Sequence, residues 1–148
     1  GKEPNSMVLD KQNRLWVLSS GGYNNEEIPE LNCINISNLQ IEKKILFASK
    51  YLSPVSLCIN KNKDSLWFIN NHIYCMTVND IQLPATALIN KKTRLFYSME
   101  LNAANSELYI SDAIDYNQNG YIYRFTPNGS VIDSLRAGII PGYFCFTK

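Results

Sequence analysis

The sequence contains little that would support catalysis or charge-driven binding. His72 is its only histidine, and 14 basic residues nearly balance 13 acidic ones, for a net charge of +1. A lone histidine with no neighbouring nucleophile and carboxylate does not form a hydrolytic triad. A balanced charge gives no electrostatic footprint for nucleic acid, and no run approaches the ~18 apolar residues of a membrane helix. We therefore expect a protein that is not an enzyme, has no catalytic residues and does not bind nucleic acid.

What the sequence does contain is a β-rich unit that recurs three times. The second strand of each unit is centred on an aromatic residue, in Leu15-Trp16-Val17, Leu66-Trp67-Phe68 and Leu108-Tyr109-Ile110. A first strand ending in a polar turn precedes it, and a third strand, a turn and a fourth strand follow. Repeats of roughly 40 to 45 residues with four short strands are typical of β-propeller blades. We predict an all-β fold built from three four-stranded antiparallel blades plus one extra strand.

The repeats predict one partial β-propeller domain over residues 1–148, with blades at about 4–50, 51–92 and 93–138. Residues 139–148 hold the extra strand, because Ile140-Pro141-Gly142-Tyr143-Phe144-Cys145-Phe146 matches Ser53-Pro54-Val55-Ser56-Leu57-Cys58-Ile59 at the start of the middle repeat. This segment would begin a fourth blade.

The spacing between repeats indicates where functional loops should lie. Trp67 follows Trp16 by 51 residues, and Tyr109 follows Trp67 by 42. Insertions between the second and third strands, at Ser19–Glu30 and Ser111–Gly120, explain the unequal spacing. Insertions confined to one class of loop project from one face of a repeat protein, which is often its binding face.

We predict that the ligand-facing residues lie in three loops of this face. The candidates are Tyr23, Asn24, Asn25, Asn71, His72, Asp112, Asp115, Tyr116 and Asn117. Aromatic residues in such loops can contact a large organic ligand or a protein, although packing of each loop onto the rim explains them equally well. Asp112 and Asp115 could form an acid–base pair, but carboxylates three residues apart in a loop more often shape a turn.

A metal or cofactor site is not expected. Asp115, Asn117 and Asn119 alternate before Gly120, which resembles the start of a calcium loop. The twelfth position of such a loop needs a bidentate glutamate, and Thr126 stands there instead. No cysteine pair has zinc-ligand spacing. We expect the four cysteines, Cys33, Cys58, Cys75 and Cys145, to be small apolar core residues rather than disulfide partners.

The third repeat and the chain end together resemble a known family. The resemblance rests on three segments: Leu108-Tyr109-Ile110-Ser111-Asp112-Ala113-Ile114-Asp115-Tyr116, Asn119-Gly120-Tyr121-Ile122-Tyr123-Arg124-Phe125 and Ala137-Gly138-Ile139-Ile140-Pro141-Gly142-Tyr143-Phe144-Cys145-Phe146. They resemble the C-terminal half of YncE-like, seven-bladed β-propeller lipoproteins of Gram-negative gut bacteria, a domain of unknown function. Some relatives capture cobalamin at the cell surface and pass it to a TonB-dependent transporter.

The resemblance implies a surface-exposed, non-enzymatic propeller, at the cell surface or in the periplasm as an outer-membrane lipoprotein. Its ligand would be a corrinoid or another large nutrient, and a TonB-dependent transporter would be its partner. The alternative is a protein–protein interaction scaffold, because open blades expose apolar faces. A propeller-type hydrolase or lyase is disfavoured, since no acid–base or metal cluster is recognisable.

Three blades are too few to close a ring, since propellers typically have four to eight. Two open edges are expected, one at Pro4–Asp10 and one at Pro141–Lys148. A homodimer would cover them with six blades and two spare strands, and would place Tyr143, Phe144 and Phe146 at or near the interface. The competing explanation is that the chain is a fragment of a longer propeller.

Overall fold

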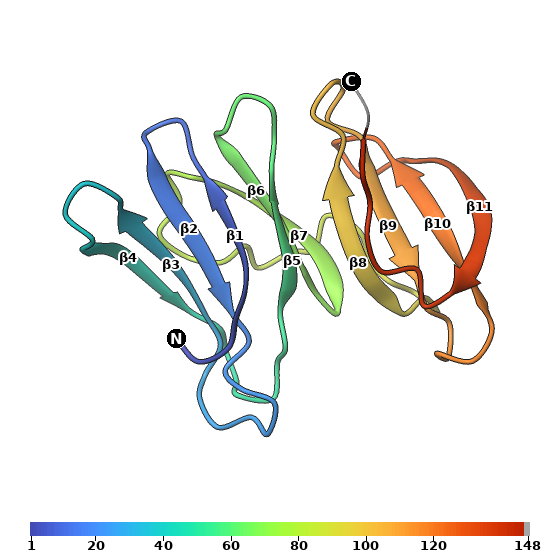
Figure 1. The fold of residues 1–148 in the computed structure, drawn as a ribbon, viewed down its shortest axis with the longest axis horizontal. Helices are drawn as coiled ribbons and strands as arrows, with labels where there is room; N and C mark the ends of the chain where they lie inside the picture. Colours follow the sequence, from blue (N-terminus) through green and yellow to red (C-terminus); the bar gives the residue numbers. More distant parts are fainter. Residues whose placement is uncertain (147–148) are drawn as a thin grey trace.

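The computed structural model describes residues 1–146, and every regular element in that range is a β-strand (Figure 1). In chain order the strands are β1 (Pro4–Leu9), β2 (Arg14–Ser19), β3 (Glu30–Asn35), β4 (Ile41–Leu46), β5 (Val55–Ile59), β6 (Ser65–Asn70), β7 (His72–Thr77), β8 (Phe96–Leu101), β9 (Leu108–Asp112), β10 (Asn119–Phe125) and β11 (Val131–Ile139). They form antiparallel sheets with the orders β1-β2-β3-β4, β5-β6-β7 and β8-β9-β10-β11. The predicted all-β fold is therefore confirmed.

The same polar turn closes the first hairpin of each sheet. Asp10, Asn60 and Asn102 stand directly after β1, β5 and β8, and each side chain accepts backbone N–H groups of the turn that follows. Asn13 and Lys63 then take the left-handed conformation, with φ of 57° and 55°. An Asp or Asn side chain that accepts a hydrogen bond from a backbone N–H of the following turn favours this turn conformation. The turn residues thus set where each second strand begins.

The three aromatic centres occupy one register position. Trp16 pairs with Val8 and Cys33, and Trp67 pairs with Cys58 and Cys75. Tyr109 pairs in the same way with Glu100 and Arg124. This agreement shows that the repeats are equivalent in structure as well as in sequence.

The core lies between the sheets in two layers. One layer holds Trp16 and Leu18 of the first sheet against Leu66 and Phe68 of the second. The other packs Trp67 against the third sheet, principally Leu108, Ile110 and Phe125. Each tryptophan therefore faces the next sheet along the chain. Burial of each large apolar side chain contributes roughly 1.5–3 kcal/mol, so these layers hold the sheets side by side.

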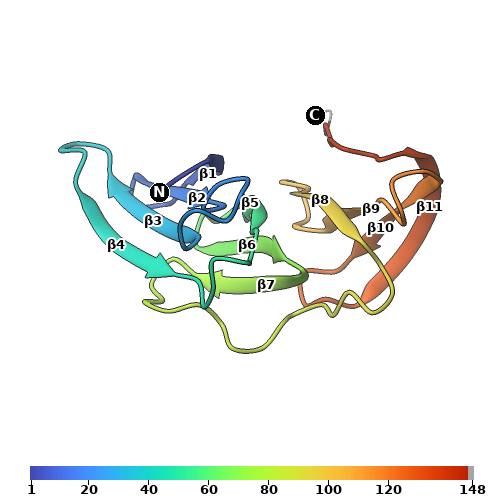
Figure 2. The same ribbon diagram turned by 90° about the horizontal axis from the view of Figure 1, so that it is seen from below.

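The three sheets fan out in an open arc (Figure 2). The first strand of each sheet lies at its inner side, and β5 contacts both β1 and β8. The outer strands β4 and β11 lie at the two ends of the arc. This arrangement is that of neighbouring propeller blades around an axis.

The middle sheet differs from the prediction, because within residues 1–146 it has three strands rather than four. Beyond β7 the chain makes one isolated bridge, Ile73 to Ile89, in place of a fourth strand. Asp80 accepts the Thr77 N–H at 2.7 Å, which turns the chain away at the end of β7. Pro84, in the segment that should pair, has no N–H to donate to a ladder.

The predicted extra strand is also not formed, because residues 140–146 belong to no sheet. Residue 139 ends β11, and residues 147–148 lie outside the described range. Phe144 and Phe146 instead pack edge-on to Tyr109, with ring centroids 6.2 and 4.9 Å away. A first strand needs a second strand to satisfy its backbone groups, and the segment finds none in the described chain.

The cysteines are free throughout the described residues. Cys33 and Cys58 are buried, as expected, and burial raises the pKa of both thiols. Cys75 is half-buried, with a pKa raised by burial to about 11. Cys145 is exposed, so the prediction of a core position is wrong for this residue.

Candidate functional site

The loops predicted to carry the site lie at one end of the sheets, at the lower side of Figure 1. They join β2 to β3, β6 to β7 and β9 to β10. The crossover between β4 and β5 reaches the same end. We call this side the loop face.

The loop between β2 and β3 presents Tyr23 to solvent. Gly21 and Gly22 have φ of 85° and 99°, which only glycine adopts readily. The Asn25 N–H donates to the Gly22 carbonyl at 3.0 Å, and the Asn24 N–H donates to the Glu26 carboxylate at 3.0 Å. The loop is thus held by its own backbone, and Tyr23 remains 88% exposed. Packing onto the rim does not account for this tyrosine.

The loop between β9 and β10 is built around Asp115. Its carboxylate accepts hydrogen bonds from the Gln118 side chain and from the Asn117 and Gln118 N–H groups, which lower its pKa. The Asn117 amide donates to the Asp115 carbonyl at 2.9 Å. Tyr116 stands edge-on to Tyr97, with ring centroids 6.0 Å apart, and is about half exposed. Asp115 and Asn117 therefore shape the loop that presents Tyr116.

Asp112 and His72 anchor the crossover between the second and third sheets. Asp112 is buried and accepts the N–H groups of Leu95 and Ile114, both at 2.9 Å. The His72 Nδ1 accepts the Lys91 N–H at 3.1 Å. Asn71 forms the tight link between β6 and β7 with φ of 62°. Asp112 and Asp115 thus serve separate turns and do not form an acid–base pair.

Within residues 1–146, no three His, Cys, Asp or Glu side chains gather as a metal site would require. The same residues include no helix long and apolar enough to cross a membrane.

The inner side of the arc carries a feature that the sequence predictions missed. Each inner strand has a register shift at the same repeat position, between Pro4 and Ser6, between Val55 and Cys58, and between Phe96 and Met99. Bulges of this kind re-aim side chains and occur next to binding sites. They bring one serine of each strand to the inner surface: Ser6, Ser56 and Ser98.

Hydrogen bonds join the first two bulged strands to each other and the third to its neighbour β9. The Leu57 N–H donates to the Ser6 hydroxyl at 3.0 Å, and the Asn5 amide donates to the Pro54 carbonyl at 2.8 Å. The Ser98 N–H donates to the Ser111 hydroxyl at 2.9 Å. Ser56 has φ of 58°, an unfavourable conformation for a residue with a side chain. The bulged backbone is therefore held by neighbouring strands.

A hollow of about 270 Å³, which we call the inner groove, lies between these strands. It is lined by Asn5, Ser6, Val55, Ser56, Tyr97, Ser98, Gly142 and Tyr143. Its polar groups are hydroxyls and an amide, with no ionisable acid or amine. Such a surface suits recognition of an uncharged polar ligand better than proton transfer. The signal that could have found it is the recurrence of serine at residues 6, 56 and 98, one equivalent position within each of the three first strands.

The arrangement of the repeated sheets has a counterpart among solved structures. No family model matches the chain, and no curated protein matches it. A solved structure that it resembles is a quinoprotein alcohol dehydrogenase-like protein from Bacteroides thetaiotaomicron, with a TM-score of 0.68 at 15% identity. The alignment covers 89% of this chain and 33% of that one. The chain thus has a β-propeller-type fold and spans about a third of the length of that protein.

Proposed function

We propose that the chain is part of a non-enzymatic binding propeller whose ligand lies on the inner groove. The observation that carries this proposal is the bulge repeated at one position of β1, β5 and β8. A single bulge can be a local irregularity, but three at equivalent positions turn their side chains toward a common hollow. Tyr97 adds an aromatic ring that is 41% exposed beside that hollow.

A corrinoid is the first ligand to test, on the strength of the resemblance to cobalamin-capturing relatives. The groove holds about 270 Å³, slightly less than the ~300–1,000 Å³ of pockets that enclose a drug-sized ligand. A corrinoid would therefore rest on the groove and not be enclosed by this chain. Location at the Gram-negative cell surface, with transfer to a TonB-dependent transporter, belongs to the same proposal.

The test is calorimetric titration of the folded chain with cobalamin, cobinamide and haem. We expect binding of a corrinoid that weakens about tenfold in Tyr97→Ala, since tenfold corresponds to ~1.4 kcal/mol and a buried aromatic contact exceeds that value. Tyr51→Ala is the matched control, because Tyr51 is 76% exposed and does not line the groove. Absence of heat with all three compounds would contradict corrinoid capture.

The second candidate function is a protein-interaction scaffold. Tyr23 is 88% exposed and Tyr51 76% exposed, and both belong to segments at the loop face. Tyrosines are enriched among the residues that dominate protein interfaces. Under this alternative, purified transporter would bind the chain with an affinity that falls in Tyr23→Ala and stays unchanged in Tyr97→Ala. The two functions therefore predict opposite sensitivities at these tyrosines.

A further inference from the structure

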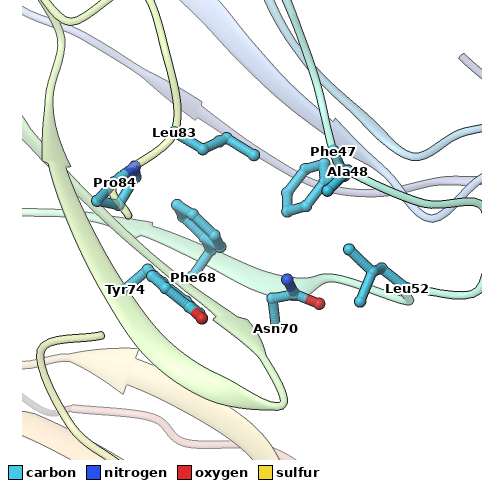
Figure 3. Close-up of a pocket in the computed structure, with 8 residues that line it drawn as sticks. All are labelled: Phe47, Ala48, Leu52, Phe68, Asn70, Tyr74, Leu83 and Pro84. Carbon is cyan, nitrogen blue, oxygen red and sulfur yellow. The ribbon is translucent and has the colours of Figure 1, made fainter. Parts of the chain in front are cut away.

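A second hollow lies at the outer rim, between the first and second sheets (Figure 3). We call it the rim pocket. Phe47, Ala48 and Leu52 approach from the crossover between β4 and β5, Phe68 and Asn70 from β6, Tyr74 from β7, and Leu83 and Pro84 from the irregular segment after β7. None of these residues lines the inner groove.

The pocket exists because the middle sheet has no fourth strand in the described chain. Residues 79–87 pass outside β7 instead of pairing along it (Figure 2), and only Leu88 and Ile89 return to bond with Ile73. Leu83 and Pro84 consequently form an outer wall, opposite the rings of β6 and β7. The first and third sheets each have a fourth strand, β4 and β11. The rim pocket is thus a feature of the middle blade.

Flat aromatic walls define the shape of the pocket. Phe68 and Tyr74 are stacked, with centroids 5.6 Å apart and planes inclined by 12°. Phe47 meets Phe68 edge-on at 5.8 Å and 82°. Offset stacks and edge-on contacts are the arrangements that aromatic rings prefer. A planar aromatic molecule can continue this pattern, whereas a branched aliphatic molecule cannot.

Two polar groups complete the pocket. The Asn70 amide and the Tyr74 hydroxyl make no side-chain hydrogen bond to any residue within the described range 1–146. In Figure 3 the hydroxyl end of Tyr74 is directed toward the side of the pocket where Asn70 lies, away from Pro84. An apolar hollow with a few well-placed polar groups is the usual form of a small-molecule site. These groups can orient a ligand that carries one donor or acceptor.

The size of the pocket limits the ligand. Its volume is about 290 Å³, whereas a dry cavity of roughly 150 Å³ accommodates benzene. We propose that the rim pocket binds a planar aromatic compound of one or two rings that carries a single polar group. The proposal does not depend on the function of the inner groove.

The probe is indole, titrated into isotopically labelled protein and followed by NMR, with cyclohexanol as a non-aromatic comparison. We expect saturable shifts of the Asn70 amide with a dissociation constant of about 1 mM or tighter, and at least tenfold weaker binding of cyclohexanol. Shifts centred on Ser98 and Tyr97 would place the ligand in the inner groove and overturn the proposal.

Ala48→Trp is the decisive variant, because Ala48 lines the pocket yet is exposed, so its replacement fills the mouth without disturbing the core. We expect at least a tenfold loss of indole affinity. Ala104→Trp places the same side chain on an exposed turn elsewhere and should bind as wild type does. Equal affinity in the two variants, or no saturable shift with indole in the folded wild-type protein, would overturn the proposal.

Tyr74→Phe tests the polar part of the proposal separately. It keeps the ring that stacks on Phe68 and removes only the hydroxyl, so the fold should be retained. We expect a few-fold weaker binding of indole and no change for benzene. An unchanged indole affinity would show that the Tyr74 hydroxyl does not recognise the ligand, and would contradict its assigned role.

Discussion

Replacement of Asp10 by asparagine should destabilise the protein strongly. Asp10 is 1% exposed. One carboxylate oxygen accepts the Gln12 and Arg14 N–H groups at 2.8 and 3.0 Å. The other accepts the Trp16 indole at 2.9 Å and the Arg14 guanidinium at 2.8 Å. Asparagine can keep the first pair of hydrogen bonds, but its NH₂ group would face two donors in place of the second oxygen.

The magnitude follows from the loss of the nearest anion of Arg14, whose guanidinium keeps only the Glu42 carboxylate at 3.9 Å and the Val78 carbonyl at 3.2 Å. Arg14 has a side chain only 12% exposed, and removal of one partner of a buried ion pair costs about 3–5 kcal/mol. That is a large part of the ~5–15 kcal/mol stability of an ordinary domain. For a chain of 148 residues a loss of 3 kcal/mol lowers the melting temperature by roughly 6–12 °C.

The middle blade supplies an internal comparison. Asn60 and Ser65 stand where Asp10 and Arg14 stand in the first blade, and the buried Trp67 indole N–H has no partner in the described residues. A blade therefore folds with asparagine at this position if no buried cation accompanies it. Asp10→Asn combined with Arg14→Ser should regain at least half of the stability lost in Asp10→Asn.

Urea unfolding followed by tryptophan fluorescence measures these differences. Asp115→Asn is the control, since that carboxylate is exposed and should leave the midpoint near the wild-type value. If Asp10→Asn unfolds within 0.5 kcal/mol of wild type, the range of ordinary surface substitutions, the reasoning is refuted. A double variant less stable than Asp10→Asn would also refute it.

Further predictions concern acid stability, assembly and secondary structure. Burial alone would raise the pKa of Asp10, but hydrogen bonds from Trp16, Arg14 and Gln12 outweigh it and lower the pKa below the ordinary 3.8. The stabilisation from the Asp10 carboxylate should therefore be complete above pH 3.8 and should disappear as the pH falls through the lowered pKa. Urea unfolding measured at several pH values should show this loss in the wild-type protein, and Asp10→Asn should lack the part that comes from Asp10. Light scattering should give twice the chain mass of 16.9 kDa, and a stable monomer would contradict the homodimer. Circular dichroism should show strand with less than about a fifth helix, and a larger helix content would contradict the fold.

The repeat was predictable because burial on both faces of a central strand leaves a strong pattern. Trp16, Trp67 and Tyr109 lie at one register position, as their alignment predicted. The missing fourth strand of the middle sheet was not predictable in this way. Residues 79–89 are long enough for a strand. However, the hydrogen bond from the Thr77 N–H to the Asp80 carboxylate turns the chain, and Pro84 cannot donate to a ladder, so the segment follows an irregular path.

The candidate site was harder to predict, because polar loop residues shape turns as readily as they bind ligands. Asp112, Asp115 and His72 all accept hydrogen bonds from neighbouring backbone N–H groups. Tyr23 was identified as a candidate for contact and is indeed fully presented to solvent, which leaves its ligand role a prediction. The serine that recurs at residues 6, 56 and 98 marks the position of the bulges but does not predict them. A positive φ such as that of Ser56 is a backbone irregularity at a residue type that does not require it.

The inner groove comes from a feature that all three sheets share, whereas the rim pocket comes from a feature that only the middle blade has. The inner groove depends on a bulge that the three inner strands share, so each additional blade around the axis would extend it with another bulged strand. The rim pocket depends on the irregular segment of one blade and on its contact with the preceding blade. Neighbouring blades, whether from a second copy or from a longer chain, should therefore increase affinity at the inner groove. They should leave indole binding at the rim unchanged, because its lining residues all come from the first two blades and the segment that follows them.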